Sequence, residues 1–262
     1  MWSLVFCLLL LALTKQLKKV LNIFRQPRTL ALLALTSLLL TINWGVYIWS
    51  VSVNRIVEAS LGYYITPLAS VSFGVFVLHE HMRKYQKVAV IIATIGVAVL
   101  TIQYGALPWI ALVLALSWSS YTLVKKTLKL GALEGLSIET VIALLPNLFY
   151  LTYIENKGTA EFGQHLGFSL LLLCAGLVTV VPLLLFNGAT TRLPLTLTGL
   201  LQYITPTIMF ILGVVVNHET MPLGRIIGFG FIWVALVFLG VDLVRSNRAA
   251  SSALQDESAA SF

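Results

Sequence analysis

Charged side chains are scarce in this sequence. Asp, Glu, Lys and Arg make up only 10% of the 262 residues, whereas hydrophobic residues make up 58%. Ordinary soluble domains carry roughly 25% charged residues, and a surface this poor in charge would not be solvated. The composition therefore excludes a soluble globular protein and predicts an integral membrane protein.

Motifs of the common soluble enzymes are also missing. The sequence contains no P-loop, no G-x-S-x-G, no H-E-x-x-H and no paired-cysteine zinc pattern. The run His79-Glu80-His81 invites a metal interpretation, but adjacent residues cannot present their side chains to one ion, so turn and capping chemistry fits it better. The two cysteines, Cys7 and Cys174, lie in apolar segments, where thiols pack as small hydrophobic groups. We therefore expect no catalytic residue, no metal and no cofactor.

The chain consists instead of apolar segments separated by short polar or basic links. About 20 apolar residues cross the core of a bilayer as a helix. Nine spans are predicted, of which the first is short: residues 2–14, 30–51, 58–78, 87–103, 106–126, 138–154, 169–187, 195–216 and 226–244. The predicted fold class is all-α, a polytopic membrane protein with nine transmembrane helices.

An internal repeat relates the two halves of the chain. Tyr64-Ile65-Thr66-Pro67 returns 139 residues later as Tyr203-Ile204-Thr205-Pro206, and at the same offset Gly74 matches Gly213 and His79-Glu80 matches His218-Glu219. Both copies lie in apolar segments, which predicts a duplicated membrane unit with a proline-interrupted helix in each half.

The repeat also predicts the domain boundaries. Residues 1–103 form the first repeat and residues 104–245 the second, whereas residues 246–262 are rich in Ala and Ser and predict a disordered tail. At the repeat offset, segment 106–126 maps to positions before Met1, so we expect the first helix and the start of the second to be missing. A complete repeat has five spans, an odd number, so the second copy enters the membrane upside down as an inverted repeat.

The basic residues predict the orientation of the chain. Of its 17 Lys and Arg residues, 14 fall in links on one side of the membrane: Lys15, Lys18, Lys19, Arg25, Arg28, Arg83, Lys84, Lys87, Lys125, Lys126, Lys129, Arg192, Arg245 and Arg248. The positive-inside rule makes that side cytoplasmic and places the C-terminus inside. This pattern explains the net charge of +7 better than nucleic-acid binding does.

The two repeated prolines predict where a solute would bind. Pro67 and Pro206 lie mid-helix, where proline frees a backbone carbonyl that must face protein or a wet cavity. In an inverted repeat the two kinks meet near the midplane, and Tyr64, Gln202 and Tyr203 would line a cavity there. The alternative is a packing kink, with small residues allowing close helix contact.

Acidic residues inside the spans are further candidates, because ionisable groups in a membrane are costly. Glu58 and Glu139 each open a predicted span and would handle substrate or a proton, with helix N-terminal stabilisation as the alternative. Asp242 is a weaker candidate near the end of the last span. Asn43 and Trp44 would line the cavity or belong to the interfacial aromatic belt.

Several of these residues carry a family resemblance. The stretch from Glu58 to Pro67, the pair Asn43-Trp44, and the later run from Phe231 to Leu236 resemble RarD-type permeases of the EamA branch of the drug/metabolite transporter superfamily. The resemblance covers nearly the whole chain. It implies ten helices in two inverted five-helix repeats, in the inner membrane of a bacterium, and it identifies no substrate.

Together these observations predict a secondary carrier that moves a small organic solute or drug-like molecule by alternating access. Its expected partners are the small-molecule substrate and the lipid bilayer, without nucleic acid. A membrane-embedded enzyme and a non-transporting membrane sensor are the alternatives that the sequence leaves open.

Overall fold

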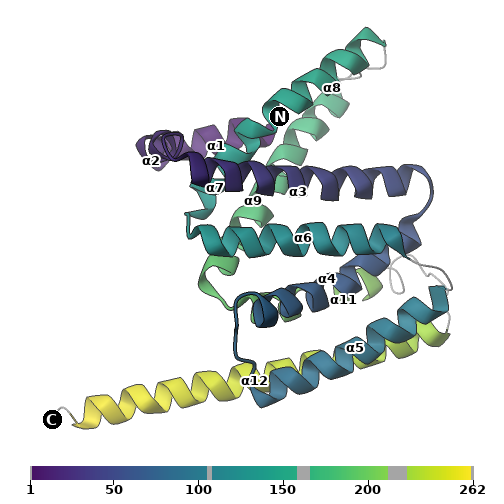
Figure 1. The fold of residues 1–262 in the computed structure, drawn as a ribbon, viewed down its shortest axis with the longest axis vertical. Coiled ribbons are helices and arrows are strands. Elements are labelled where there is room, and N and C mark those ends of the chain that lie inside the picture. Colours follow the sequence, from purple (N-terminus) through teal and green to yellow (C-terminus); the bar gives the residue numbers. More distant parts are fainter. Residues whose placement is uncertain (1, 105–107, 158–165, 212–222, 261–262) are drawn as a thin grey trace. The chain divides into compact units, whose positions relative to one another are not determined.

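Helices make up nearly all of the described chain. A computed structural model describes residues 2–104, 108–157, 166–211 and 223–260 (Figure 1). The helices in chain order are α1 (Trp2–Leu13), α2 (Leu17–Ile23), α3 (Pro27–Ser52), α4 (Ile56–Phe76), α5 (Lys84–Tyr104), α6 (Trp109–Leu128), α7 (Ala132–Ile142), α8 (Leu144–Asn156), α9 (Leu166–Arg192), α10 (Leu195–Leu201), α11 (Ile204–Ile211) and α12 (Leu223–Ala260). These residues contain no strand. The predicted all-α class is therefore confirmed.

Six spans within the described residues are long and apolar enough to cross a bilayer: Pro27–Ser52, Glu58–Phe76, Lys84–Ile102, Ala132–Tyr153, Ser169–Arg192 and Ile226–Arg245. This confirms a polytopic membrane protein but not the expected count of nine. Helix α1 has only 12 residues, too few for a bilayer core of about 30 Å. Helix α6 has 20 residues but combines three serines with two lysines. The predicted span 195–216 ends outside the described residues.

Prolines divide two of the predicted spans. Helix α7 ends at Ile142 and α10 at Leu201. In each case a proline follows four or five residues later, Pro146 and Pro206, and proline cannot donate to the carbonyl four residues before it. The chain turns through Gln202, whose amide donates to the Gly199 carbonyl at 3.0 Å.

Pro67 behaves differently from its repeat mate. It lies inside α4, which continues through it to Phe76. The expectation of an interrupted helix in each half is therefore wrong for the first copy. Neighbouring groups support α4 there, because Ser119 of α6 donates to the Thr66 carbonyl at 3.1 Å and the Thr66 hydroxyl donates to the Gly62 carbonyl at 2.7 Å. A helix held in this way tolerates a proline.

The chain forms two compact units, each built from parts of both sequence halves. Unit 1 comprises Met1–Gly45 and Ser120–Leu193, and unit 2 comprises Val46–Ser119 and Pro194–Phe262. At the 139-residue offset, α3 corresponds to α9 in unit 1, and in unit 2 α4 corresponds to α10 with α11 and α5 to α12. Repeat-related helices therefore share a unit.

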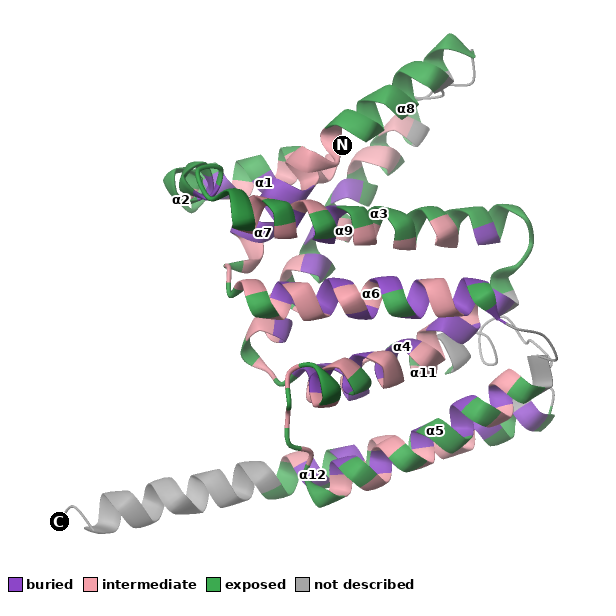
Figure 2. Ribbon diagram, viewed as in Figure 1, coloured by how far each residue is buried: buried purple, intermediate pink, exposed green. Residues whose placement is uncertain are grey.

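In unit 1, the short helix α1 packs against α7 and α9. A Cβ atom at Gly176 of α9 would lie 2.6 Å from the Cβ atom of Trp2, so only glycine fits at this crossing. The buried apolar core of the unit consists of Leu11, Val20, Ile23, Leu33 and Ile138. By contrast, α8 is exposed over most of its length (Figure 2).

In unit 2, α5 and α12 lie side by side and run antiparallel (Figure 1). A Cβ atom at Gly96 of α5 would lie 2.9 Å from the Gly228 carbonyl oxygen of α12. Nearer the other end of α12, the Asp242 carboxylate accepts from Gln86 Nε2 at 3.0 Å and Arg83 Nη1 at 3.3 Å. Because these two helices are repeat mates, their opposed directions agree with an inverted repeat.

The second pair of repeat mates, α4 and α10, is also antiparallel. A Cβ atom at Gly199 of α10 would meet the Pro67 carbonyl oxygen at 3.0 Å, and one at Gly74 would meet Thr196 Cγ2 at 2.9 Å. These glycines bring the two backbones close together, as small residues do in membrane helix interfaces.

Helix α12 continues to Ala260. The sequence predicts a disordered tail for residues 246–262, and the structure instead places helix over most of it. Ala, Leu, Gln and Glu are good helix formers, so a segment without an apolar period still extends the preceding helix.

Candidate functional site

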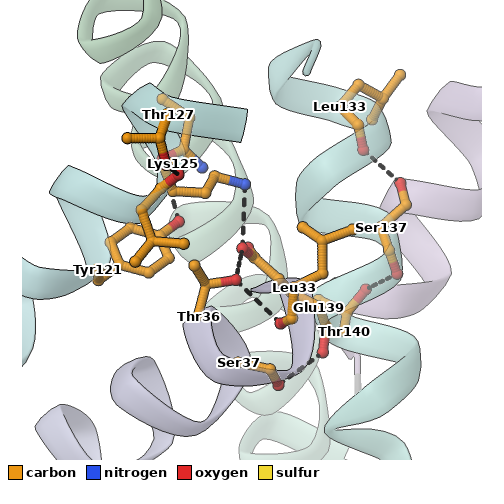
Figure 3. A network of polar contacts seen from close by, with 12 residues as sticks. Leu33, Thr36, Ser37, Tyr121, Lys125, Thr127, Leu133, Ser137, Glu139 and Thr140 are labelled. Carbon is orange, nitrogen blue, oxygen red and sulfur yellow. Dashed lines mark hydrogen bonds and ion pairs between the residues drawn. The ribbon is translucent and has the colours of Figure 1, made fainter. Parts of the chain in front are cut away.

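A buried polar cluster in unit 1 surrounds Glu139 of α7 (Figure 3). Its Oε1 atom accepts a hydrogen bond from Thr36 Oγ1 at 2.5 Å and lies 3.1 Å from Lys125 Nζ. The side chains of Glu139 and Lys125 are only 2% and 5% exposed. The cluster is therefore an ion pair removed from solvent and supported by a hydroxyl of α3.

Helix geometry explains how these groups meet. Helix α7 begins at Ala132, so Glu139 lies two turns inside it rather than at its start, and helix N-terminal stabilisation does not apply to it. On α3 the neighbouring Ser37 donates to the Glu139 carbonyl oxygen at 3.0 Å. Two successive residues of α3 thus bind both the side chain and the backbone of one residue of α7.

Two further polar residues extend the cluster. The Tyr121 hydroxyl of α6 donates to Asn187 Oδ1 of α9 at 3.0 Å, and both residues are fully buried. Lys125 lies one turn after Tyr121, with its ammonium 5.8 Å from the centre of the ring. The cluster therefore draws side chains from α3, α6, α7 and α9.

Two buried atoms of the cluster have no hydrogen-bond partner, Glu139 Oε2 and Asn187 Nδ2. Most buried polar atoms in proteins are satisfied, and each exception needs an explanation. The carboxylate oxygen of Glu139 can accept a hydrogen bond, and the amide nitrogen of Asn187 can donate one. The cluster therefore retains binding capacity for a proton or a small polar group.

Glu58 plays a different part in unit 2. It lies in the first turn of α4, and its Oε1 accepts from the backbone amide of Ile110, at the start of α6, at 2.9 Å. Its Oε2 lies 3.8 Å from Arg55 Nη1. A carboxylate at a helix N-terminus satisfies free amides and complements the helix dipole, so the observed geometry is that of a cap on α6.

Glu80 caps a helix in the same way. Its Oε1 accepts from the Leu195 amide at 2.7 Å, and its Oε2 accepts from the Thr196 amide at 2.8 Å and from the Thr196 hydroxyl at 2.9 Å. Capping is the role that the sequence suggests for the His79-Glu80 pair. The repeated pair His218-Glu219 lies outside the described residues.

The predicted aromatic and proline residues of unit 2 lie around the α4 and α10 crossing. Tyr203, Pro67 and Pro206 are buried, and Tyr64 is half-buried with its ring 5.2 Å from that of Phe229 in an edge-on arrangement. The Tyr203 hydroxyl is buried without a hydrogen-bond partner. Gln202 is half-buried, and its Nε2 donates to the Thr198 carbonyl at 3.5 Å.

The remaining predicted residues, Asn43 and Trp44, lie on α3 within unit 1. Asn43 is half-buried, whereas Trp44 is 41% exposed. The structure thus divides the predicted site residues, with Asn43, Trp44 and Glu139 in unit 1 and the others in unit 2.

Sequence reasoning missed Lys125, Thr36, Tyr121 and Asn187. Lys125 precedes Lys126 at the end of a span, so it resembles a cytoplasmic anchor charge, yet its side chain is buried. Asn187 could have been predicted as a site residue from the sequence, because a side-chain amide inside an apolar segment needs a hydrogen-bond partner. Among the described residues, no group of three or more His, Cys, Asp or Glu side chains is placed to hold a metal ion.

Comparisons with known proteins identify the relatives of the chain. The model of the EamA-like transporter family matches residues 1–102 and 107–241. Protein RarD of Streptomyces exfoliatus is 45% identical over 97% of this chain and 81% of its own length. An uncharacterized transporter of Vibrio cholerae is 40% identical over 96% of this chain and 84% of its own. The chloramphenicol-sensitive protein RarD of Pseudomonas aeruginosa is 28% identical over 94% and 84%.

A crystal structure of a protein with 18% sequence identity superposes with a TM-score of 0.61, over 95% of this chain and 88% of the other. At this identity the likeness concerns the fold alone. The family match spans nearly the whole chain, and the relatives are named as RarD proteins and transporters. This multi-pass membrane protein therefore belongs to the EamA-like transporter family, as an RarD-type permease.

Proposed function

We propose that this membrane transporter is a secondary carrier, which moves a small organic solute by alternating access rather than by catalysing a reaction. One observation carries the proposal: in unit 2, α4 and α5 each pack antiparallel against their own repeat mates, α10 and α12. Inverted repeats of this kind allow a carrier to present the same site to either side of the membrane.

The solute path in unit 2 would run along the α4 and α10 crossing. Tyr203 supplies a buried hydroxyl without a partner, and a turn at Gln202 interrupts the helix beside it. Unwound backbone and unsatisfied polar groups at membrane depth are typical of solute sites in carriers. We assign Tyr64, Tyr203 and Gln202 to this path, with Pro206 maintaining the break.

The proposed location is the inner membrane of a bacterium, with the C-terminus in the cytoplasm. Bacterial relatives and the distribution of Lys and Arg support it. The substrate is proposed to be a small organic or drug-like molecule, since one relative carries chloramphenicol sensitivity in its name. No nucleic-acid partner is proposed.

Counterflow in proteoliposomes tests this function. Liposomes with the purified chain are loaded with an excess of unlabelled solute, and uptake of the labelled form is followed for chloramphenicol and for a panel of amino acids. In a carrier, the concentration of labelled solute inside transiently exceeds that outside. The reason is that each unlabelled molecule that leaves brings the binding site back to the outer face, where it takes up a labelled molecule. Chemical analysis of the recovered solute separates transport from turnover, and turnover without translocation would favour a membrane enzyme.

Substitution of the repeated prolines tests the path. Pro206→Ala restores an amide to the break and is expected to slow counterflow, because the backbone beside Tyr203 can then close into a helix. Pro67→Ala is the matched control, since α4 is already continuous there. Equal rates in both variants, at equal amounts of folded protein, would remove the break from the mechanism.

A further inference from the structure

Four acidic side chains with helix-packing roles have been described, and Glu139 differs from the other three. Glu58, Glu80 and Asp242 each accept hydrogen bonds from a helix N-terminus or from donors on a neighbouring helix. Among the buried carboxylate oxygens that the structure describes, only Glu139 Oε2 lacks a partner. The other oxygen of the same carboxylate is held by Thr36 and Lys125.

We propose that Glu139 is a proton-binding site, at which Oε2 takes up a proton and thereby releases the ion pair with Lys125. The inference rests on the proposed carrier function and names the ion that would drive it. The site is built for this exchange, because one oxygen is fixed by neighbours while the other is left unoccupied in a buried environment.

The surrounding groups favour a reversible proton. Lys125 of α6 is the cation that faces the carboxylate, while Thr36 and Ser37 of α3 are neutral hydrogen-bond donors. The other titratable groups near Glu139 are the phenol of Tyr121 on α6 and the thiol of Cys7 on α1. At the start of α7, Glu134 lies 3.9 Å from Lys19 of α2, and α9 contributes the neutral Asn187.

The proposed step balances as a simple protonation. Water on one side of the membrane gives a proton to Glu139 Oε2, which becomes a neutral carboxylic acid, while Lys125 keeps its own proton and loses its counter-charge. Release of the proton to the other side restores the ion pair. Side chains of α3, α6 and α7 meet at this ion pair. Opening the pair therefore changes the interaction between these three helices, and protonation can shift the equilibrium between two conformations.

Infrared spectroscopy tests proton binding without a substrate. The full chain is reconstituted in liposomes of phosphatidylethanolamine and phosphatidylglycerol, and difference spectra are recorded from alkaline to acid pH. The chain has 10 Asp and Glu residues, and we expect one titrating carbonyl band of the wild type, that of protonated Glu139, to be missing from Glu139→Gln. Glu58→Gln is the matched control and should retain the band. Identical titrating bands in the folded wild type and in Glu139→Gln would overturn the proposal.

Transport measurements test coupling to the proton. In the same liposomes, Glu139→Gln should keep counterflow of the labelled solute at equal pH on both sides, but lose uptake driven by an imposed pH gradient. If uptake by the wild type does not change with the pH gradient, solute transport is not coupled to the proton. If the wild type shows no counterflow with any probe, the carrier function fails, while the infrared experiment still decides whether Glu139 binds a proton.

A second variant guards against misfolding. If Glu139→Gln leaves Lys125 buried without a counter-charge and the protein does not fold, the pair Lys125→Met and Glu139→Gln removes both charges together. We expect this double variant to fold, to lack the titrating band and to lose gradient-driven uptake. Gradient-driven uptake in the folded double variant would overturn the proposal.

Discussion

At the residue scale, the Glu139 and Lys125 pair shows that the role of a charged side chain depends on its surroundings. Lys125 contributes to the basic count from which the orientation of the chain is predicted, yet its side chain lies in the interior of unit 1 next to a carboxylate. A buried ion pair adds little net stability, because each charge loses its hydration. The presence of such a pair in an apolar protein therefore indicates function more than stabilisation.

Removal of one partner of the pair predicts a pH-dependent loss of stability. Lys125→Met should lower the free energy of unfolding by about 3–5 kcal/mol at alkaline pH, since it leaves a buried carboxylate without a counter-charge. The loss should shrink as the pH falls, because a protonated Glu139 carries no charge and needs no cation. Denaturant unfolding in detergent across pH measures both effects.

The control for this variant is Lys126→Met. Lys126 is next in sequence and donates to the Leu193 carbonyl. Its replacement removes a hydrogen bond from a charged donor, which should cost about 1.5–3 kcal/mol without a comparable pH dependence. Equal pH profiles for the two variants would contradict the assignment of Lys125 as the counter-charge of Glu139.

At the element scale, glycines decide how closely the repeat mates approach. Gly199→Ala should destabilise the protein by about 1–3 kcal/mol, since the added Cβ atom would lie 2.9 Å from Ser70 Cβ and 3.0 Å from the Pro67 carbonyl oxygen. Gly230→Ala is the matched control, because a Cβ atom there meets nothing within 4 Å. Thermal unfolding in detergent should show a lower midpoint for the first variant alone.

The antiparallel direction of α5 and α12 predicts a specific disulfide. In a background without Cys7 and Cys174, the variants Leu100→Cys and Gly228→Cys together should cross-link on oxidation, since a Cβ atom at Gly228 would lie 2.6 Å from Leu100 Cγ. The pair Leu100→Cys and Leu243→Cys should remain free, because Leu243 lies at the opposite end of the antiparallel pair. Mass spectrometry of proteolytic fragments distinguishes the two results, and a reversed result would mean that these repeat mates are parallel.

At the scale of the whole molecule, the sequence repeat and the compact units divide the chain differently. The family model matches two segments that meet near residues 102–107, whereas each structural unit takes helices from both halves. Repeat-related helices pack against each other in unit 2, so neither half buries its apolar faces alone there. The two halves therefore share one apolar packing interface in unit 2.

The orientation of the chain predicts the behaviour of C-terminal fusions. A green fluorescent protein attached after Phe262 should fluoresce and alkaline phosphatase should be inactive, because the positive-inside rule predicts a cytoplasmic C-terminus from the excess of Lys and Arg. Expression of both fusions in a bacterium, normalised for protein amount, measures the result. Active phosphatase with a dark fluorescent fusion would place the C-terminus outside and reverse the proposed topology.

The sequence by itself determined the class, the repeat and the family. Low charge and long apolar segments are sufficient to predict a polytopic helical membrane protein, because few backbone structures other than helices can satisfy their hydrogen bonds inside lipid. The spacing of 139 residues identified the repeat mates, and the odd number of spans in a complete repeat indicated their inversion. These features are carried by residue types along the chain and need no knowledge of contacts.

The tertiary structure alone decided what individual polar residues do. Glu58 and Glu139 each open a predicted span in the sequence, but one binds the start of α6 and the other forms a buried ion pair with a lysine 14 residues away. Pro67 and Pro206 lie in identical motifs, yet only the second follows a break. The reason is physical: the effect of a charge or of a missing amide depends on the donors and acceptors that neighbouring helices place around it, and those neighbours are distant in sequence.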